Sequence, residues 1–384
     1  MTRSILLACL LFTACGSDAP PDAPLAPGVI GRAAGRVRVR VVNARDGAPL
    51  EGAQVASDDA SGVTDALGEV LLPAGDAIRA EATGFRGETF VGAEAAAMTF
   101  ALEPLAAPAT RTVTITLAGW SDWVAAEGEG LVARISVGRD PRIDHASVPS
   151  AECLGTSPTC EVSLTVPEGT SSAFAELAVI VDGETPEDPS DDVEAPLGFA
   201  FGVLTETATL EAVEAVVEVE LDLELPPGID RVVGVPGIRV DDEVLVFSAP
   251  SHGRARFAVP TLTGRFEGAT LWAIARHESG EQVARTVVRA NAGELRGTFE
   301  LPSPLTLVAS RVGAVVEVET SAPLVTLATP NHVVRVFDGR TSVASPSLSG
   351  AIEVAATEAP AFEDGWNLDL VESHWTRRTS QTLP

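Results

Sequence analysis

Apolar and polar residues alternate with a period of two along much of the chain, which is the pattern of β-strands that bury one face. In residues 36–41, Val37, Val39 and Val41 fall on one side of such a strand and arginines fall on the other. Turns rich in Gly, Pro, Asn and Asp separate these runs, and no segment keeps a helical period. Residues 207–213 could also form a short helix, but the Val, Glu and Leu alternation after them favours a strand. The sequence therefore predicts an all-β fold.

The first predicted module, residues 35–105, carries three motifs in a fixed order. They are DGAPLEGAQV at 46–55, TDALGEVLLP at 64–73 and IRAEATGFRGE at 78–88. Together these motifs resemble the carboxypeptidase regulatory-like domain, a small prealbumin-type β-sandwich. The resemblance implies a structural or ligand-presenting module without peptidase activity, because no histidine of the chain begins the His-x-x-Glu pair that the catalytic zinc domain needs.

An internal repeat predicts further modules. The hexapeptide AVVEVE occurs at 215–220 and at 314–319, 99 residues apart. A Val-rich opening strand, a strand ending in Pro or a turn, and a strand running into Gly-Glu recur in the same order. We therefore expect tandem prealbumin- or immunoglobulin-like β-sandwiches at 35–105, 111–213, 215–313 and 314–384, the last one shorter and lacking closing strands. Coincidence in a low-complexity Val-Glu pattern is the alternative explanation of the hexapeptide.

The N-terminus has the layout of a secretory signal peptide, residues 1–14, followed by a cysteine. The stretch LFTAC at 11–15 resembles a bacterial lipobox, which implies acylation of Cys15 and attachment to a lipid bilayer. Cys9 is a second candidate, but it leaves almost no apolar region before it. Residues 15–34, rich in Pro, Ala and Asp, are expected to form a tether. Gly16 after the cysteine implies sorting to the outer membrane, on either face, and no later segment is apolar enough to span a membrane.

Two cysteines remain in the exported part, Cys153 and Cys160, and we expect a disulfide between them in an oxidising compartment. A structural zinc would need further ligands, and a redox site would favour Cys-x-x-Cys spacing.

The composition limits the possible functions. A net charge of -28 disfavours binding to nucleic acids, whose recognition depends on clustered cations. The chain contains no lysine and no tyrosine, which excludes Schiff-base chemistry on lysine. No nucleotide-binding or nucleophile-elbow motif is present, so no cofactor is expected.

Two groups of residues are candidates for ligand binding. The acidic loop at 182–194 could supply oxygen ligands to Ca²⁺, although it lacks the EF-hand spacing and such runs are usually solvated; its candidate ligands are Asp182, Glu184, Asp188, Asp191 and Asp192. Exposed indoles could stack on sugar rings, whereas buried ones are core anchors; the candidates are Trp120, Trp123, Trp272 and Trp366. His277 begins a near match to a zincin motif, but its context predicts strand and turn instead of helix.

These features favour a non-catalytic cell-envelope lipoprotein that acts as a structural or interaction scaffold. The alternatives are an array of carbohydrate-binding modules at the cell surface and a hydrolase with a dispersed active site.

Overall fold

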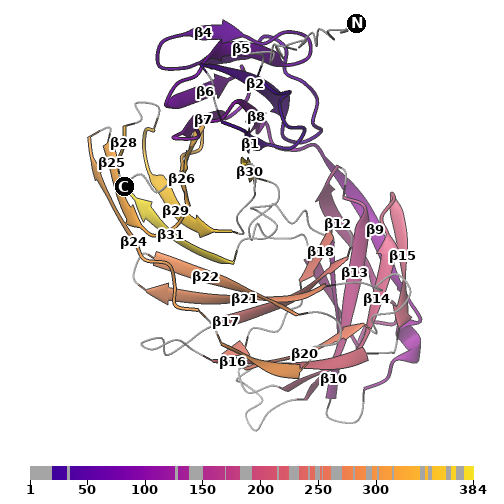
Figure 1. Cartoon of the computed structure of the whole chain (residues 1–384). Helices are drawn as coiled ribbons and strands as arrows, with labels where there is room; N and C mark the ends of the chain where they lie inside the picture. The colour runs from indigo at the N-terminus through magenta and orange to yellow at the C-terminus, as the bar shows by residue number, and fades with distance from the viewer. Residues whose placement is uncertain are drawn as a thin grey trace, which may run out of the picture.

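The protein is all-β, as the alternation predicts, in a computed structural model of the whole chain (Figure 1). The structure describes residues 20–32, 35–125, 129–137, 150–168, 170–181, 193–213, 216–224, 233–240, 243–246, 251–252, 254–260, 270–279, 282–290, 296–300, 302–313, 315–337, 342–344, 348–359, 365–368 and 376–384. Within these residues, the strands fall into four successive groups, which we call the first to fourth units.

The first unit is a pair of sheets around a shared core. Its strands are β2 (Arg36–Asn43), β3 (Gln54–Ala56), β4 (Ser61–Val63), β5 (Glu69–Pro73), β6 (Ala77–Glu81), β7 (Gly87–Val91) and β8 (Ala97–Leu102). In one sheet, β2 lies between β5, which is antiparallel to it, and β8, which is parallel. In the other, β3 pairs with β4 and β6, and β6 pairs with β7. The valines of β2 are buried between the sheets, as their spacing predicts.

The second unit repeats this pairing. Its strands are β9 (Thr110–Ala118), β10 (Glu129–Val137), β11 (Ser150–Leu154), β12 (Glu161–Pro167), β13 (Ser172–Val181), β14 (Val193–Val203) and β15 (Thr207–Val213). The opening strand β9 again has the Pro-ending strand β12 antiparallel on one side and the last strand β15 parallel on the other. Again β10 pairs with β11 and β13, and β13 pairs with β14. An extra β14–β15 ladder joins the two halves into one sheet of seven strands.

The third unit has the same design. Its strands are β16 (Val216–Glu224), β17 (Val233–Val240), β18 (Glu243–Val246), β19 (Ser251–His252), β20 (Arg254–Pro260), β21 (Thr270–Ser279), β22 (Gln282–Ala290) and β23 (Arg296–Glu300). The opening strand β16 lies between the antiparallel β20 and the parallel β23, and β21 lies between β17 and β22. One order of strand pairing therefore recurs in three units, in agreement with the recurring order of sequence motifs.

The fourth unit departs from this design at one place. Its strands are β24 (Leu307–Val312), β25 (Val315–Thr320), β26 (Leu324–Ala328), β27 (His332–Phe337), β28 (Ser342–Ala344), β29 (Ile352–Glu358), β30 (Gly365–Asn367) and β31 (Arg377–Leu383). The opening strand β25 pairs with β28 as expected, but its other side is filled by the preceding strand β24, which is antiparallel. The position of the parallel closing strand in the other units is thus taken by β24, the strand just before the opening strand.

The structure decides one ambiguous segment of the sequence and differs from the expectation for another. The ambiguous residues 207–213 form the strand β15. The expected tether is shorter than 15–34, because its described part lies on the first unit: β1 (Gly28–Ile30) pairs with β8 and with β30. Ala23 and Val29 are buried there, so apolar contacts hold a segment whose Pro-rich composition indicates a spacer.

Strand pairing also connects units that are far apart in the sequence. A continuous sheet runs β18-β17-β21-β22-β31-β29-β26-β27-β7-β6-β3-β4, through the third, fourth and first units. The second unit contacts the third, where β14 touches β16 and β20. Figure 1 shows the four units around a circuit, with the yellow fourth unit beside the indigo first unit. The module boundaries expected from the sequence remain a prediction, because this continuity does not show which parts fold alone.

Candidate functional site

The expected disulfide is confirmed. Cys153 and Cys160 are bonded with an S–S distance of 2.07 Å and a Cα–Cα distance of 5.5 Å. Cys153 lies on β11 and Cys160 directly precedes β12, and these two strands are the opposite edges of the seven-stranded sheet. The bond therefore fastens the two edges of the second unit to each other, a role that the short spacing in the sequence does not reveal.

The described tryptophan side chains belong to the core of the second unit. Trp120 is 4% exposed, and its Nε1–H donates a hydrogen bond of 3.0 Å to the Ser157 carbonyl. Trp123 packs half-buried against the same core. Trp120 is therefore unavailable for stacking on a sugar. Trp272 and Trp366 lie on β21 and β30, but their side chains are outside the described residues.

Other candidates lie wholly or partly outside the described part. Cys9, Cys15 and the acidic residues at 182–192 are not among the described residues, so acylation and calcium binding stay predictions. His277 lies on the strand β21, in agreement with the context expected for it. Among the described residues, no cluster of three or more His, Cys, Asp or Glu side chains could hold a metal ion, and no helix has the length and apolarity to cross a bilayer.

A group of polar contacts joins the first unit to the fourth. Strand β7 runs parallel to β27, with residues 87–91 beside residues 332–336. The Gly87 N–H donates to the Asn331 carbonyl at 2.9 Å, and the Arg86 guanidinium donates to the Thr329 carbonyl. We call this region the first–fourth junction.

A buried ion pair crosses the first–fourth junction. Glu88 is 5% exposed, and Arg335 donates from Nε to its Oε1 at 2.6 Å. Burial raises the pKa of the Glu88 carboxyl, and the Arg335 charge partly offsets that rise. Burial also lowers the pKa of the neighbouring Arg86. Because each charge is poorly solvated, removal of one partner would leave the other uncompensated, at a cost of about 3–5 kcal/mol.

A buried histidine lies on the other face of the β7–β27 ladder from this ion pair, because side chains alternate between the two faces along each strand. His332 is 3% exposed, and a hydrogen bond of 2.8 Å joins its Nε2 to Thr89 Oγ1. Burial, with the nearby Arg79 charge, lowers the pKa of His332 to about 4. The ring fits only because residue 87 is glycine: a Cβ there would lie 2.5 Å from His332 Nδ1.

Aromatic packing completes the first–fourth junction. The rings of Phe90 and Phe100 are stacked with centroids 4.1 Å apart. Phe337 from the fourth unit meets Phe90 edge-on, with centroids 5.5 Å apart. All three rings are almost fully buried, so the fourth unit contributes Phe337 to the hydrophobic core of the first unit.

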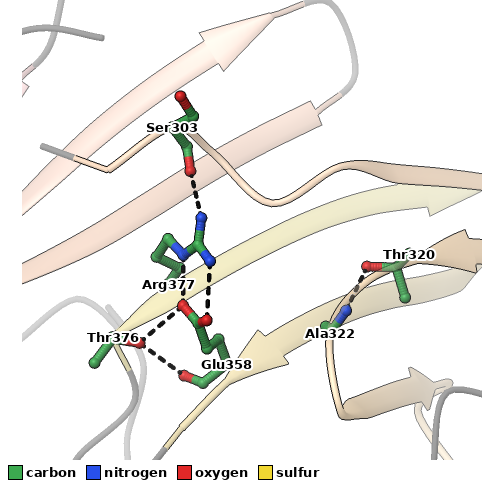
Figure 2. Close-up of polar contacts among 6 residues, drawn as sticks. All are labelled: Ser303, Thr320, Ala322, Glu358, Thr376 and Arg377. Carbon is green, nitrogen blue, oxygen red and sulfur yellow. Dashed lines mark hydrogen bonds and ion pairs between the residues drawn. The ribbon is translucent and has the colours of Figure 1, made fainter.

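The fourth unit is joined to the third by a second set of contacts. β31 pairs with β22, and Gln282 Nε2 donates to the Leu307 carbonyl at 2.6 Å. Figure 2 shows Arg377 of β31 reaching both Glu358 oxygens, at 2.5 and 2.9 Å, and the Ser303 carbonyl at 2.8 Å. The hydrogen bond from Arg377 lowers the pKa of Glu358. The C-terminal strand is thus fixed to the segment that leads into the fourth unit.

The chemistry of the first–fourth junction suits structural connection better than acid–base catalysis. The Thr89–His332 contact pairs a hydroxyl with a potential base, as nucleophilic catalysis requires. A histidine with a pKa of about 4 is a weak base at neutral pH, however. The sequence signal for this site was Gly87 alone, since a glycine in a strand often marks a close approach of another group.

Comparison with known proteins gives no family for the chain. No protein-family description and no curated protein sequence matches it. Among solved structures, the Bacillus anthracis TIE protein is similar at 11% identity with a TM-score of 0.16, over 69% of this chain and 50% of that one. The match thus spans about half the length of that protein, and a TM-score this low does not establish a shared fold.

Proposed function

We propose that the chain is an exported lipoprotein, acylated on Cys15, that acts as a non-catalytic scaffold in the bacterial cell envelope, on the outer membrane. The observation that carries the scaffold proposal is the continuous sheet that joins the first unit to the fourth and the fourth to the third. Units connected by backbone ladders keep a fixed relative position, in contrast to modules on flexible linkers. A fixed arrangement of surfaces is what a scaffold needs to hold partners.

The first unit is proposed to be a regulatory-like sandwich used for presentation or structure. Two sheets with β2 at the centre of one of them support this reading, as does the burial of the motif residues Val55, Leu72 and Ile78 between the sheets. The proposed partners are a lipid bilayer, through the acyl chain, and an envelope protein.

The anchor is tested by metabolic labelling with a clickable palmitate analogue. Wild type and Cys9→Ser should both be labelled, and Cys15→Ser should not. Equal labelling of Cys15→Ser and wild type would overturn acylation at Cys15, and loss of label in Cys9→Ser alone would move the anchor to the other cysteine.

The scaffold role is tested by crosslinking in intact envelopes. Because the chain contains no lysine, one introduced lysine provides a unique side-chain amine for a bifunctional amine crosslinker. We expect Val63→Lys or Val203→Lys, at residues that are each 61% exposed in the first and second units, to give an adduct of one defined mass. Absence of adducts from exposed positions on all four units would contradict a scaffold.

A further inference from the structure

One outward surface of the first unit concentrates positive charge in an acidic protein. Val37, Val39 and Val41 of β2 are buried, so the intervening arginines project from the opposite side of the sheet. We call this surface the arginine face; it consists of Arg36, Arg38 and Arg40 on β2 with Glu69 and Leu71 on β5.

The charge of the arginine face is positive although the chain carries -28. Its nearby carboxylates, Glu69 and Asp22, both pair with Arg38, at 3.2 and 3.5 Å. Among the described residues, neither Arg36 nor Arg40 forms an ion pair with a carboxylate. Interactions between charges more than about 8–10 Å apart are largely screened at physiological salt. The electrostatic potential at the arginine face is therefore set by Arg36 and Arg40 and not by distant acidic residues.

The segment that leads from the proposed lipid anchor crosses this same face. Asp22 reaches Arg38, and Thr99 of β8 donates from Oγ1 to the Pro24 carbonyl at 2.5 Å. The segment then continues as β1, paired to β8. The described chain therefore begins beside the arginine face, and this placement brings the anchor to it.

The remaining length between anchor and face is short. Only four residues lie between Cys15 and Pro20, and the five Cα–Cα steps that join them span at most about 18 Å. The headgroup layer on each side of a bilayer is about 5–8 Å thick. An acyl anchor on Cys15 would therefore keep Pro20, which leads into the arginine face, within about 10–13 Å of the headgroups, even with the connection fully stretched.

We propose that the arginine face lies against a phospholipid bilayer, with the guanidinium groups of Arg36 and Arg40 bound to headgroup phosphates. Leu71, 37% exposed and opposite Arg38 on the β2–β5 ladder, and Leu25, 85% exposed in the segment that crosses the face, contact the apolar part of the headgroup region. This inference rests on the proposed acylation of Cys15. It assigns the first unit to the membrane surface, while the third unit lies on the far side of the circuit (Figure 1).

The test uses the full acylated chain in vesicles of phosphatidylethanolamine and phosphatidylglycerol. A fluorophore is placed on Leu71→Cys, in the face, or on Val308→Cys, a 56% exposed position in the fourth unit, and a headgroup spin label serves as quencher. We expect strong quenching at position 71 and little at position 308. Each arginine at an anionic surface contributes about fivefold, so Arg36→Gln with Arg40→Gln should reduce the membrane-facing population about 25-fold. Arg134→Gln, in the second unit, is the charge control and should leave quenching unchanged.

Flotation of the vesicles separates failure of the anchor from failure of this inference. A chain that does not float overturns the anchor and, with it, the inference. A chain that floats but shows equal quenching at positions 71 and 308, or quenching at 71 that survives the double arginine substitution, overturns the inference alone. The glutamine side chains keep most of the aliphatic stem, and unchanged thermal unfolding would show that the double variant remains folded.

Discussion

Replacement of Gly87 by alanine should weaken the first–fourth junction. The added methyl carbon would lie 2.5 Å from His332 Nδ1 and 2.9 Å from its Cε1, far inside an ordinary contact of about 3.5–4 Å. The backbone at Gly87 is outside the left-handed region, so the cost is steric alone. The His332 ring is buried and bonded to Thr89, and it can move away only by losing that hydrogen bond. Overpacking of this kind costs about 1–3 kcal/mol.

Amide hydrogen exchange of peptides that cover β7 and β27 would measure this loss as a lower free energy of local opening. Gly130→Ala is a matched control, because the nearest atoms to its added carbon are 3.8 Å away in ordinary contact. In a His332→Ala background the obstructing ring is gone, so adding Gly87→Ala should lower the free energy of local opening by less than about a further 0.5 kcal/mol. An equal cost in both backgrounds would refute the steric explanation.

Three further changes have defined outcomes. Burial lowers the pKa of His332 from 6.5 to about 4, so below pH 6.5 the unfolded chain binds a proton that the folded protein does not. The free energy of unfolding should therefore decrease by roughly 2–3 kcal/mol as the pH falls from 6.5 toward 4. The unfolding free energy of wild type relative to His332→Gln should fall by that amount from pH 7 to pH 4, and a flat difference would refute it; the opposite effect of the raised pKa of Glu88 cancels in this comparison. Replacing both Cys153 and Cys160 by serine should destabilise the second unit by about 2–3 kcal/mol, seen as a lower Tm that reductant no longer changes. Phe337→Ala should cost about 3–5 kcal/mol and increase exchange in the first unit as well as the fourth, whereas a loss confined to the fourth would contradict shared packing.

The sequence predicts well those features that depend on local alternation. The opening strands β2, β9, β16 and β25 follow from their alternation of apolar and polar residues. The disulfide is expected because Cys153 and Cys160 are the two cysteines left once Cys9 and Cys15 are assigned to the signal peptide and the lipid anchor.

The sequence does not predict the first–fourth junction, for a physical reason. The sequence pattern predicts β7 and β27 as half-buried strands. Their pairing is made by backbone groups along the strand edges, and the local sequence does not show which strand a given edge will pair with. The residues before β1 are equally misleading, because Pro and Ala indicate a spacer, whereas Ala23 is buried on the sheet. Glu88 meets Arg335, and His332 meets Thr89, only after this pairing brings the two strands together.

The parallel pairing of β7 with β27 has a consequence for the order of folding events during synthesis of the chain. The hydrogen-bonded residues are separated by up to 247 positions, so the first unit emerges from the ribosome long before its partner strand. Until then, the edge of β7 is open and Phe90 lacks its neighbour Phe337, a state prone to edge-to-edge association. Closing so long a loop is slow compared with forming hairpins. Folding of the nascent chain should therefore depend on chaperones that cover the open edge, and a truncation before β27 should increase that dependence.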